Sequence, residues 1–322
     1  MPVRHPNGIT CRCRKEQPRL IASDEASSTP DWLFWRPAAR PPMIMSTTTR
    51  VRRMRLPAAV LIAVMTPLTA WAATPAVFNA AAPTIAGHRA TYALGLKSST
   101  DQGVLAADGS MTYDVTDACT GWTTSQHLII NLTDRDGREV RMVSDYATFE
   151  TKDGSKLTFH TKQMTDQTVT EQLDGVAVLD RSGGHGHADF SAPEHKRVLL
   201  PAGTMLPNAH TLAVLQAAMT GKRFLAVPLF DGTGSDGAQD SFVTIENWHG
   251  PRTEKWSSLS GLPSGRVHVA FFDRDQTTEM PDYEIGMRYF NNGVADDLAM
   301  NFGDFVMAGK LDQFELKNGP RC

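Results

Sequence analysis

Four cysteines are the residues of this chain best suited to covalent chemistry. Cys11 and Cys13 lie upstream of a segment that has the form of a secretory signal, so only Cys119 and the last residue, Cys322, would remain after export. Two cysteines in an oxidising compartment predict one disulfide, which would tie the end of the chain back to the start of its mature part. Closing a loop of about 200 residues is worth about 5 kcal/mol on the chain-entropy account, as an upper limit.

The export signal is expected at residues 45–72. It begins with a basic stretch that contains four arginines, continues with an apolar run at residues 56–68, and ends in Ala70-Trp-Ala72. This order, with an A-x-A site, is typical of a cleaved signal peptide, and the apolar run is too short for a permanent anchor. We therefore expect cleavage after Ala72 and a periplasmic protein. Residues 1–44 are expected to result from a start codon that was assigned too early, or to form a disordered extension.

Charge excludes some classes of partner. Residues 1–72 hold 11 of the 32 Lys and Arg and 4 of the 35 Asp and Glu, so the remainder carries 21 basic and 31 acidic residues, a net charge of −10. Such a surface disfavours nucleic acid and anionic membranes, both of which attract clustered cations. The mature part holds no second apolar run of membrane length, so no integral membrane segment is expected there.

Histidines form the cluster that most resembles a metal site: His185 and His187 flank a glycine, and His195 follows. Two imidazoles placed in this way can converge on one zinc or copper ion. Local spacing places no carboxylate or cysteine beside them, so a solvated glycine-rich loop is the favoured interpretation. We predict no metal and no cofactor.

Acidic turns and catalytic motifs give no stronger signal. Residues 231–237 and 134–137 resemble fragments of calcium loops, but neither has the glutamate that completes such a loop at its twelfth position. Turn chemistry explains both segments. The sequence contains no G-x-S-x-G elbow and no S-x-x-K turn, so no catalytic residues are predicted.

Hydrophobicity with a period of two dominates the mature chain and predicts β-strands. Tyr283, Ile285, Met287 and Tyr289, for example, alternate with residues of the opposite face. About 14 strand candidates run from residues 90–96 to residues 305–316. Five Asx-Gly dipeptides predict tight turns between antiparallel strands: Asp108-Gly109, Asp136-Gly137, Asp153-Gly154, Asp174-Gly175 and Asn292-Gly293.

One segment, residues 208–220, has helical spacing. Asn208 or Thr211 could cap its start, and Gly221 suits the position after its end. A single helix among so many strands predicts an all-β, mainly antiparallel sheet that curls around the helix or is plugged by it. Residues 73–87 are expected to be a flexible lead-in, and residues 88–322 a single domain.

Several separated motifs carry a family resemblance. They are HRATY at 88–92, DACTGW at 117–122, LPAGTMLPNAH at 200–210, LFDG at 229–232, VAFFD at 269–273, PDYE at 281–284, NG at 292–293, GDF at 303–305 and the terminal Cys322. In this order they resemble the cell-envelope integrity EipB-like family of alphaproteobacteria, formerly a domain of unknown function, over about residues 87–322. Asn301, Phe302 and Asn208 depart conservatively from the residues that the family tends to carry there.

The resemblance implies a periplasmic protein with a spiral, half-open β-barrel, a disulfide like Cys119–Cys322, and a role in envelope integrity. It implies no catalytic residues, because the family has no established activity. The preferred hypothesis is a non-enzymatic protein that binds another envelope protein through a sheet edge or groove.

Two alternatives remain open. The first is a lipid or lipoprotein carrier, in which the helix acts as a lid over a half-barrel cavity; the lid residues are His210, Leu212, Leu215 and Met219. The second is an envelope hydrolase; its candidate histidines are His160, His185, His187 and His210. A carrier requires an inner face that side chains leave unfilled.

Overall fold

The computed structural model describes residues 83–322, apart from residues 101–102, 275–279 and 321. The expected upstream segment, the export signal and residues 73–82 therefore lie outside the described residues. None of the helices formed by the described residues has the length and apolar character needed to cross a membrane.

The described part of the chain forms fourteen strands, one α-helix and one 3₁₀ helix. In chain order they are β1 (His88–Ser99), β2 (Ala106–Asp117), β3 (Gly121–Thr133), β4 (Glu139–Thr151), β5 (Lys156–Thr165), β6 (Thr168–Leu179), β7 (Gly186–Ala192), β8 (Lys196–Leu200), α1 (Pro207–Met219), β9 (Phe224–Leu229), β10 (Gln239–His249), η2 (Ser257–Leu259), β11 (Ser264–Phe272), β12 (Tyr283–Phe290), β13 (Ala295–Asn301) and β14 (Phe305–Leu316).

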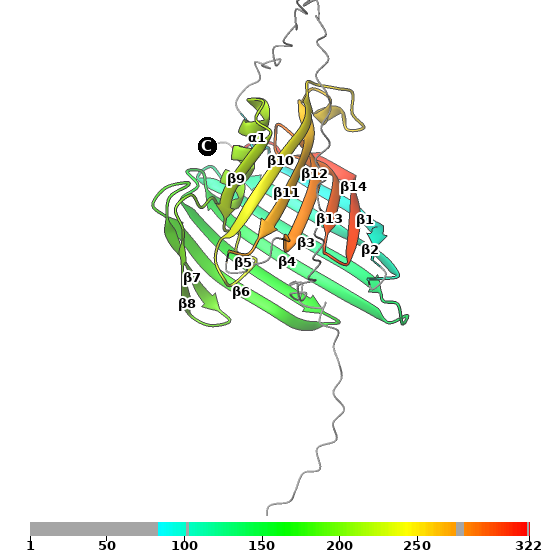
Figure 1. The fold of residues 1–322 in the computed structure, drawn as a ribbon. Coiled ribbons are helices and arrows are strands. Elements are labelled where there is room, and N and C mark those ends of the chain that lie inside the picture. The colour runs from blue at the N-terminus through cyan, green and yellow to red at the C-terminus, as the bar shows by residue number, and fades with distance from the viewer. Residues whose placement is uncertain (1–82, 101–102, 275–279, 321) are drawn as a thin grey trace, which may run out of the picture.

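All fourteen strands belong to one antiparallel sheet. Its order is β8-β7-β6-β5-β4-β3-β2-β1-β14-β13-β12-β11-β10-β9, so the first and last strands of the domain, β1 and β14, are neighbours in the middle of the sheet. The sheet curls into a half-open barrel whose two edges are β8 and β9 (Figure 1). An isolated parallel bridge joins Met205, in the segment after β8, to Leu229 at the end of β9. The predicted fold class is confirmed.

A disulfide joins Cys119, in the loop between β2 and β3, to Cys322, with the two Cα atoms 5.9 Å apart. The sequence analysis predicted a disulfide between these two cysteines. The N–H of Lys317, directly after β14, donates to the carbonyl of Gly87, directly before β1, at 2.8 Å. The Lys317 ammonium also forms an ion pair with Asp114 of β2.

Three of the five predicted Asx-Gly turns lie between strands, at residues 136–137, 153–154 and 292–293. The predictions at Asp108-Gly109 and Asp174-Gly175 are wrong, because these dipeptides lie inside β2 and β6. At Gly109 a Cβ atom would stand 2.1 Å from the carbonyl oxygen of Ile129, and at Gly175 2.5 Å from that of Asp189. Glycine is required at both positions because the backbone of a neighbouring strand approaches closely. The sequence of the dipeptide does not distinguish this role of glycine from its role in a turn.

The expected flexible lead-in ends earlier than predicted. Ile85 is buried and packs with Val115 and Trp122, and the N–H of Ala86 donates to the carbonyl of Asn292 at 2.9 Å. Residues 83–87 are thus part of the folded body, because an apolar side chain and a backbone hydrogen bond anchor them to the barrel.

Candidate functional site

Helix α1 lies at one end of the barrel, between the two edge strands in chain order (Figure 1). It begins at Pro207 after Leu206, and no side chain of its own caps it, so the predicted caps at Asn208 and Thr211 are wrong. Proline at the first helical position has the backbone angle that a helix needs. The predicted glycine at the other end is confirmed, since Gly221 has a φ of +76° directly after the capping residue Thr220.

A carboxylate from the barrel wall caps the helix instead. Glu150 of β4 accepts hydrogen bonds from the backbone N–H groups of Asn208 (2.6 Å) and Ala209 (2.9 Å). Those N–H groups have no partner within the helix, and the positive end of the helix dipole favours an anion there. Glu150 therefore fastens the helix to a strand that is 58 residues away in the sequence.

Glu150 is fully buried, and this burial raises the pKa of its carboxyl to about 7, although the amide hydrogen bonds act in the opposite direction. The sequence analysis missed this residue. A signal was present: Glu150 is in phase with Tyr146 and Thr148, so it falls on the inner face of β4 although it is charged.

The barrel encloses a cavity of about 1080 Å³, and helix α1 contributes Pro207, Asn208, His210, Thr211 and Val214 to its lining. Of the four predicted lid residues, only His210 lines the cavity. The others point elsewhere: Leu212 packs on the small core around Ile85, and Leu215 is completely buried. The helix thus closes the cavity with its first two turns.

His210 is held as a neutral hydrogen-bonding group. Its Nε2 lies 2.9 Å from the hydroxyl oxygen of Ser241, and that hydroxyl donates to the carbonyl of Val227 at 2.8 Å. Because the only hydroxyl proton is used on Val227, Nε2 must carry the proton that it donates to Ser241. Burial lowers the pKa of His210 to about 4, so the ring is neutral at pH 7.

All five tyrosines of the chain line this cavity. Two of their hydroxyls are tied to backbone carbonyls: Tyr92 donates to Ala295 (2.8 Å) and Tyr146 to Asp231 (2.9 Å). Burial raises the pKa of each phenol above its usual value, so all five remain neutral at physiological pH. The sequence analysis placed Tyr283 and Tyr289 on one face of a strand, but did not recognise a tyrosine-lined interior.

Two unlike walls face the cavity. Strands β3, β4 and β5 contribute the polar side chains of Gln126, Ser144 and Gln163. Strands β11 to β13 contribute an apolar wall: Val269, Phe271, Ile285, Met287, Leu298 and Met300. The alternation predicted for residues 283–289 is confirmed, since all four residues of the set that it placed on one face line the cavity.

The comparisons with known proteins decide the family. The model of the EipB-like family matches residues 79–318. This chain belongs to the EipB-like family. It is 28% identical over 265 residues to the cell envelope integrity protein EipB of Brucella abortus (strain 2308), which covers 78% of this chain and 93% of the relative. A crystal structure from Brucella abortus, of a beta-barrel-like protein of domain of unknown function DUF1849, matches with a TM-score of 0.68 and 25% identity, over 74% of this chain and all of that one.

In this EipB-like chain two of the three histidines singled out for a metal have separate carboxylate partners. His185 lies 3.1 Å from Asp180, and His187 lies 3.5 Å from Asp189, which also binds Arg197. His195 is in the loop between β7 and β8. Among the described residues no three or more His, Cys, Asp or Glu side chains are grouped so that they could hold a metal ion. His160 pairs with Asp174, away from the cavity.

The two acidic loops are turns, as their sequences indicate. Asp134 accepts hydrogen bonds from the N–H groups of Asp136 (2.9 Å) and Arg138 (2.8 Å). Asp231 accepts from the N–H and the hydroxyl of Thr233, at 2.9 and 2.8 Å. Both carboxylates order their own loops, which is ordinary Asx-turn chemistry.

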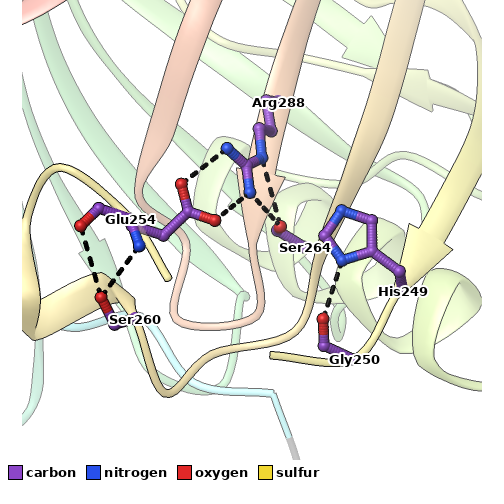
Figure 2. A network of polar contacts seen from close by, with 6 residues as sticks. All are labelled: His249, Gly250, Glu254, Ser260, Ser264 and Arg288. Carbon is purple, nitrogen blue, oxygen red and sulfur yellow. Dashed lines mark hydrogen bonds and ion pairs between the residues drawn. The ribbon is translucent and has the colours of Figure 1, made fainter. Parts of the chain in front are cut away.

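A polar network outside the cavity contains a serine, a histidine and a glutamate, but its geometry is structural (Figure 2). Arg288 of β12 donates to the carboxylate of Glu254 and to the hydroxyl oxygen of Ser264, at 2.8 and 3.0 Å. Ser264 is completely buried and acts as an acceptor, which does not suit a nucleophile. The ring of His249 bonds to the carbonyl of Gly250 at 2.8 Å. The network fastens the loop after β10 to β11 and β12.

Proposed function

We propose that this EipB-like chain supports the integrity of the cell envelope from the periplasm, as a binding protein without catalytic activity, and that its partner is another envelope protein. The name of the relative from Brucella abortus supports the envelope role. The observation that carries the binding mode is the edge of the sheet at β9, where part of the backbone has no strand partner among the residues that the structure describes.

The register of β9 shows which backbone groups are available. The N–H of Ile245 donates to the carbonyl of Arg223, so this opposed pair of β10 and β9 is hydrogen-bonded. Along each strand of an antiparallel pair, such residues alternate with residues whose N–H and C=O groups point away from the partner strand. Phe224 and Ala226 therefore direct their N–H and C=O groups outward. Further along the edge, the outward carbonyl of Pro228 is already used by the N–H of Met205 at 2.8 Å.

The surface beside this edge is apolar. Phe224 and Phe242 are 59% and 43% exposed, and their rings stack with centroids 6.0 Å apart. A strand of the partner that pairs with Phe224 and Ala226 would satisfy their backbone groups and cover this aromatic pair.

The experiment uses Ala226→Pro in a strain that lacks the gene for this chain. Proline removes an N–H that points outward, so the ladder with β10 is kept while pairing on the outer side is blocked. We expect the variant to accumulate and melt like the parent but to leave the strain sensitive to detergent and to antibiotics that intact envelopes exclude. Leu105→Ser, at an exposed leucine away from the edge, is the control that should restore resistance. Restoration by Ala226→Pro would contradict the proposal.

The cavity favours a second candidate, a carrier for a lipid or a lipoprotein acyl chain. At about 1080 Å³ it lies just above the usual range for small-molecule sites. The first two turns of helix α1, with His210 facing the cavity, would be the lid in this case, and Glu150 would hold the helix in place. Native mass spectrometry of protein taken from its own periplasm would detect a bound lipid and a bound protein in one measurement.

A further inference from the structure

We propose that the cavity binds an amphiphile with a hydrocarbon tail and an uncharged, hydroxyl-rich head group, such as a sugar-headed lipid, and rejects anionic lipids. This inference rests on the second candidate function, in which the barrel carries a lipid, and it specifies the chemical class of that lipid.

The polar wall requires a ligand with hydrogen-bonding groups. Ser144 of β4 and Gln163 of β5 are opposed in the sheet, and Gln126 of β3 lies nearby on the same inner face. All three side chains are half-buried, and none of them forms a hydrogen bond with another described residue. A bare acyl chain would strip water from these groups and replace none of their hydrogen bonds, which is unfavourable. Hydroxyl groups can both donate to them and accept from them.

The opposite wall requires hydrocarbon. Val269, Phe271, Ile285, Met287 and Met300 line it, and methionine adapts its shape to flexible chains. Tyrosine rings extend this surface toward helix α1, where Tyr289 and Thr211 line the closed end. A tail that enters along this wall would end against the first turns of the helix.

Charge selects against an anionic head group. The described residues that line the cavity include five acids and one Arg or Lys residue, Arg274, which is paired with Asp240. One of the acids, Asp236, lies 3.9 Å from the ammonium of Lys196. The acids are Glu171, Asp231, Asp236, Asp273 and Asp282. Glu171 is opposed to Gln163 across β6 and β5, so a head group held by the polar wall would lie beside a carboxylate. A phosphate or carboxylate placed there would approach a group of the same charge.

The test compares three compounds that share a dodecyl tail, each used below its micelle concentration. They are dodecyl maltoside, dodecyl phosphate and dodecyltrimethylammonium, and binding to the mature disulfide-bonded protein is followed by native mass spectrometry and calorimetry. We expect the maltoside to bind at least about tenfold more tightly than the phosphate. The acids would attract the ammonium compound, but it offers no hydrogen bond to the polar wall, so it should also bind more weakly than the maltoside. Tighter binding of the ammonium compound than of the maltoside would contradict the inference of an uncharged head group.

Variants locate the effect. Gln163→Leu with Ser144→Val should weaken maltoside binding about tenfold, while Gln172→Leu, at an exposed glutamine on the other face of the same sheet, should leave it unchanged. Glu171→Lys should strengthen binding of the phosphate. Binding of the phosphate as tightly as the maltoside, or equal binding by the Gln163 variant and the parent, would overturn the inference about the head group while leaving the carrier function intact. Binding of none of the three compounds would overturn both, and neither result bears on the Ala226→Pro experiment.

Discussion

Glu150 makes a contribution to stability that depends on pH, and Glu150→Gln should remove that contribution. Burial raises the pKa of Glu150 from an ordinary value of 4.5 to about 7 in the folded protein. Between these values the folded state still binds a proton that the unfolded chain has released. By linkage, the contribution of Glu150 to stability therefore falls as pH rises through this window and levels off only once the pH exceeds the folded pKa. A shift of about 2.5 units corresponds to about 3 kcal/mol.

Glutamine has nearly the shape of glutamate but does not titrate. Its carbonyl can accept from the N–H of Asn208 or Ala209, but its amide nitrogen cannot, so one of the two capping bonds is lost. We expect the variant to be less stable than the parent by about 1 kcal/mol near pH 4.5, where both side chains are neutral. At pH 8 the parent carries the cost of a buried charge and the variant does not, so the difference should move by about 3 kcal/mol in favour of the variant.

Urea unfolding curves at pH 4.5, 6, 7 and 8, followed by far-ultraviolet circular dichroism, would measure this. Glu139→Gln, at an exposed position on the same strand, controls for the removal of one surface charge and should follow the parent at every pH. The reasoning would be refuted if the difference in unfolding free energy between the parent and Glu150→Gln were the same at pH 4.5 and pH 8.

Two further predictions concern the framework of the barrel. Replacing Cys119 and Cys322 together by serine should lower the free energy of unfolding by about 2–5 kcal/mol, because the disulfide closes a loop spanning 203 positions. Urea unfolding would measure the loss, and a variant as stable as the oxidised parent would contradict this prediction. Gly109→Ala should cost at least about 2 kcal/mol, since its Cβ would meet the carbonyl of Ile129, whereas Gly95→Ala, on the paired strand with open space around it, should be neutral or slightly stabilising. Equal melting temperatures for the two glycine variants would show that the close approach at Gly109 is not real.

Local patterns in the sequence predicted a large part of the fold. Alternation at residues 283–289 identified the residues that share a face, because successive side chains of any strand point to opposite sides. Helical spacing at residues 208–220 located helix α1 to within one residue at each end. Counting cysteines outside the expected signal was enough to pair Cys119 with Cys322.

The limits of local patterns are visible at two glycines. Asp108-Gly109 and Asp174-Gly175 have the composition of a hairpin turn, yet both are within strands. In both strands, a carbonyl oxygen of the neighbouring strand lies too close to leave room for a Cβ atom at the glycine. That neighbour is known only when the register of the sheet is known, so the sequence of the dipeptide does not contain the information.

The sequence by itself determined which residues alternate, where the single helix lies and which cysteines are available to pair, since each depends on neighbours along the chain or on simple counting. Only the tertiary structure decided the site. Glu150 meets the start of helix α1 across 58 residues, and the five tyrosines come together from β1, β2, β4 and β12. Which face of each strand points inward, and which side chains stand across the cavity from it, depend on how the sheet curls and in what register its strands pair. Those are properties of the whole curled sheet, and no single segment determines them.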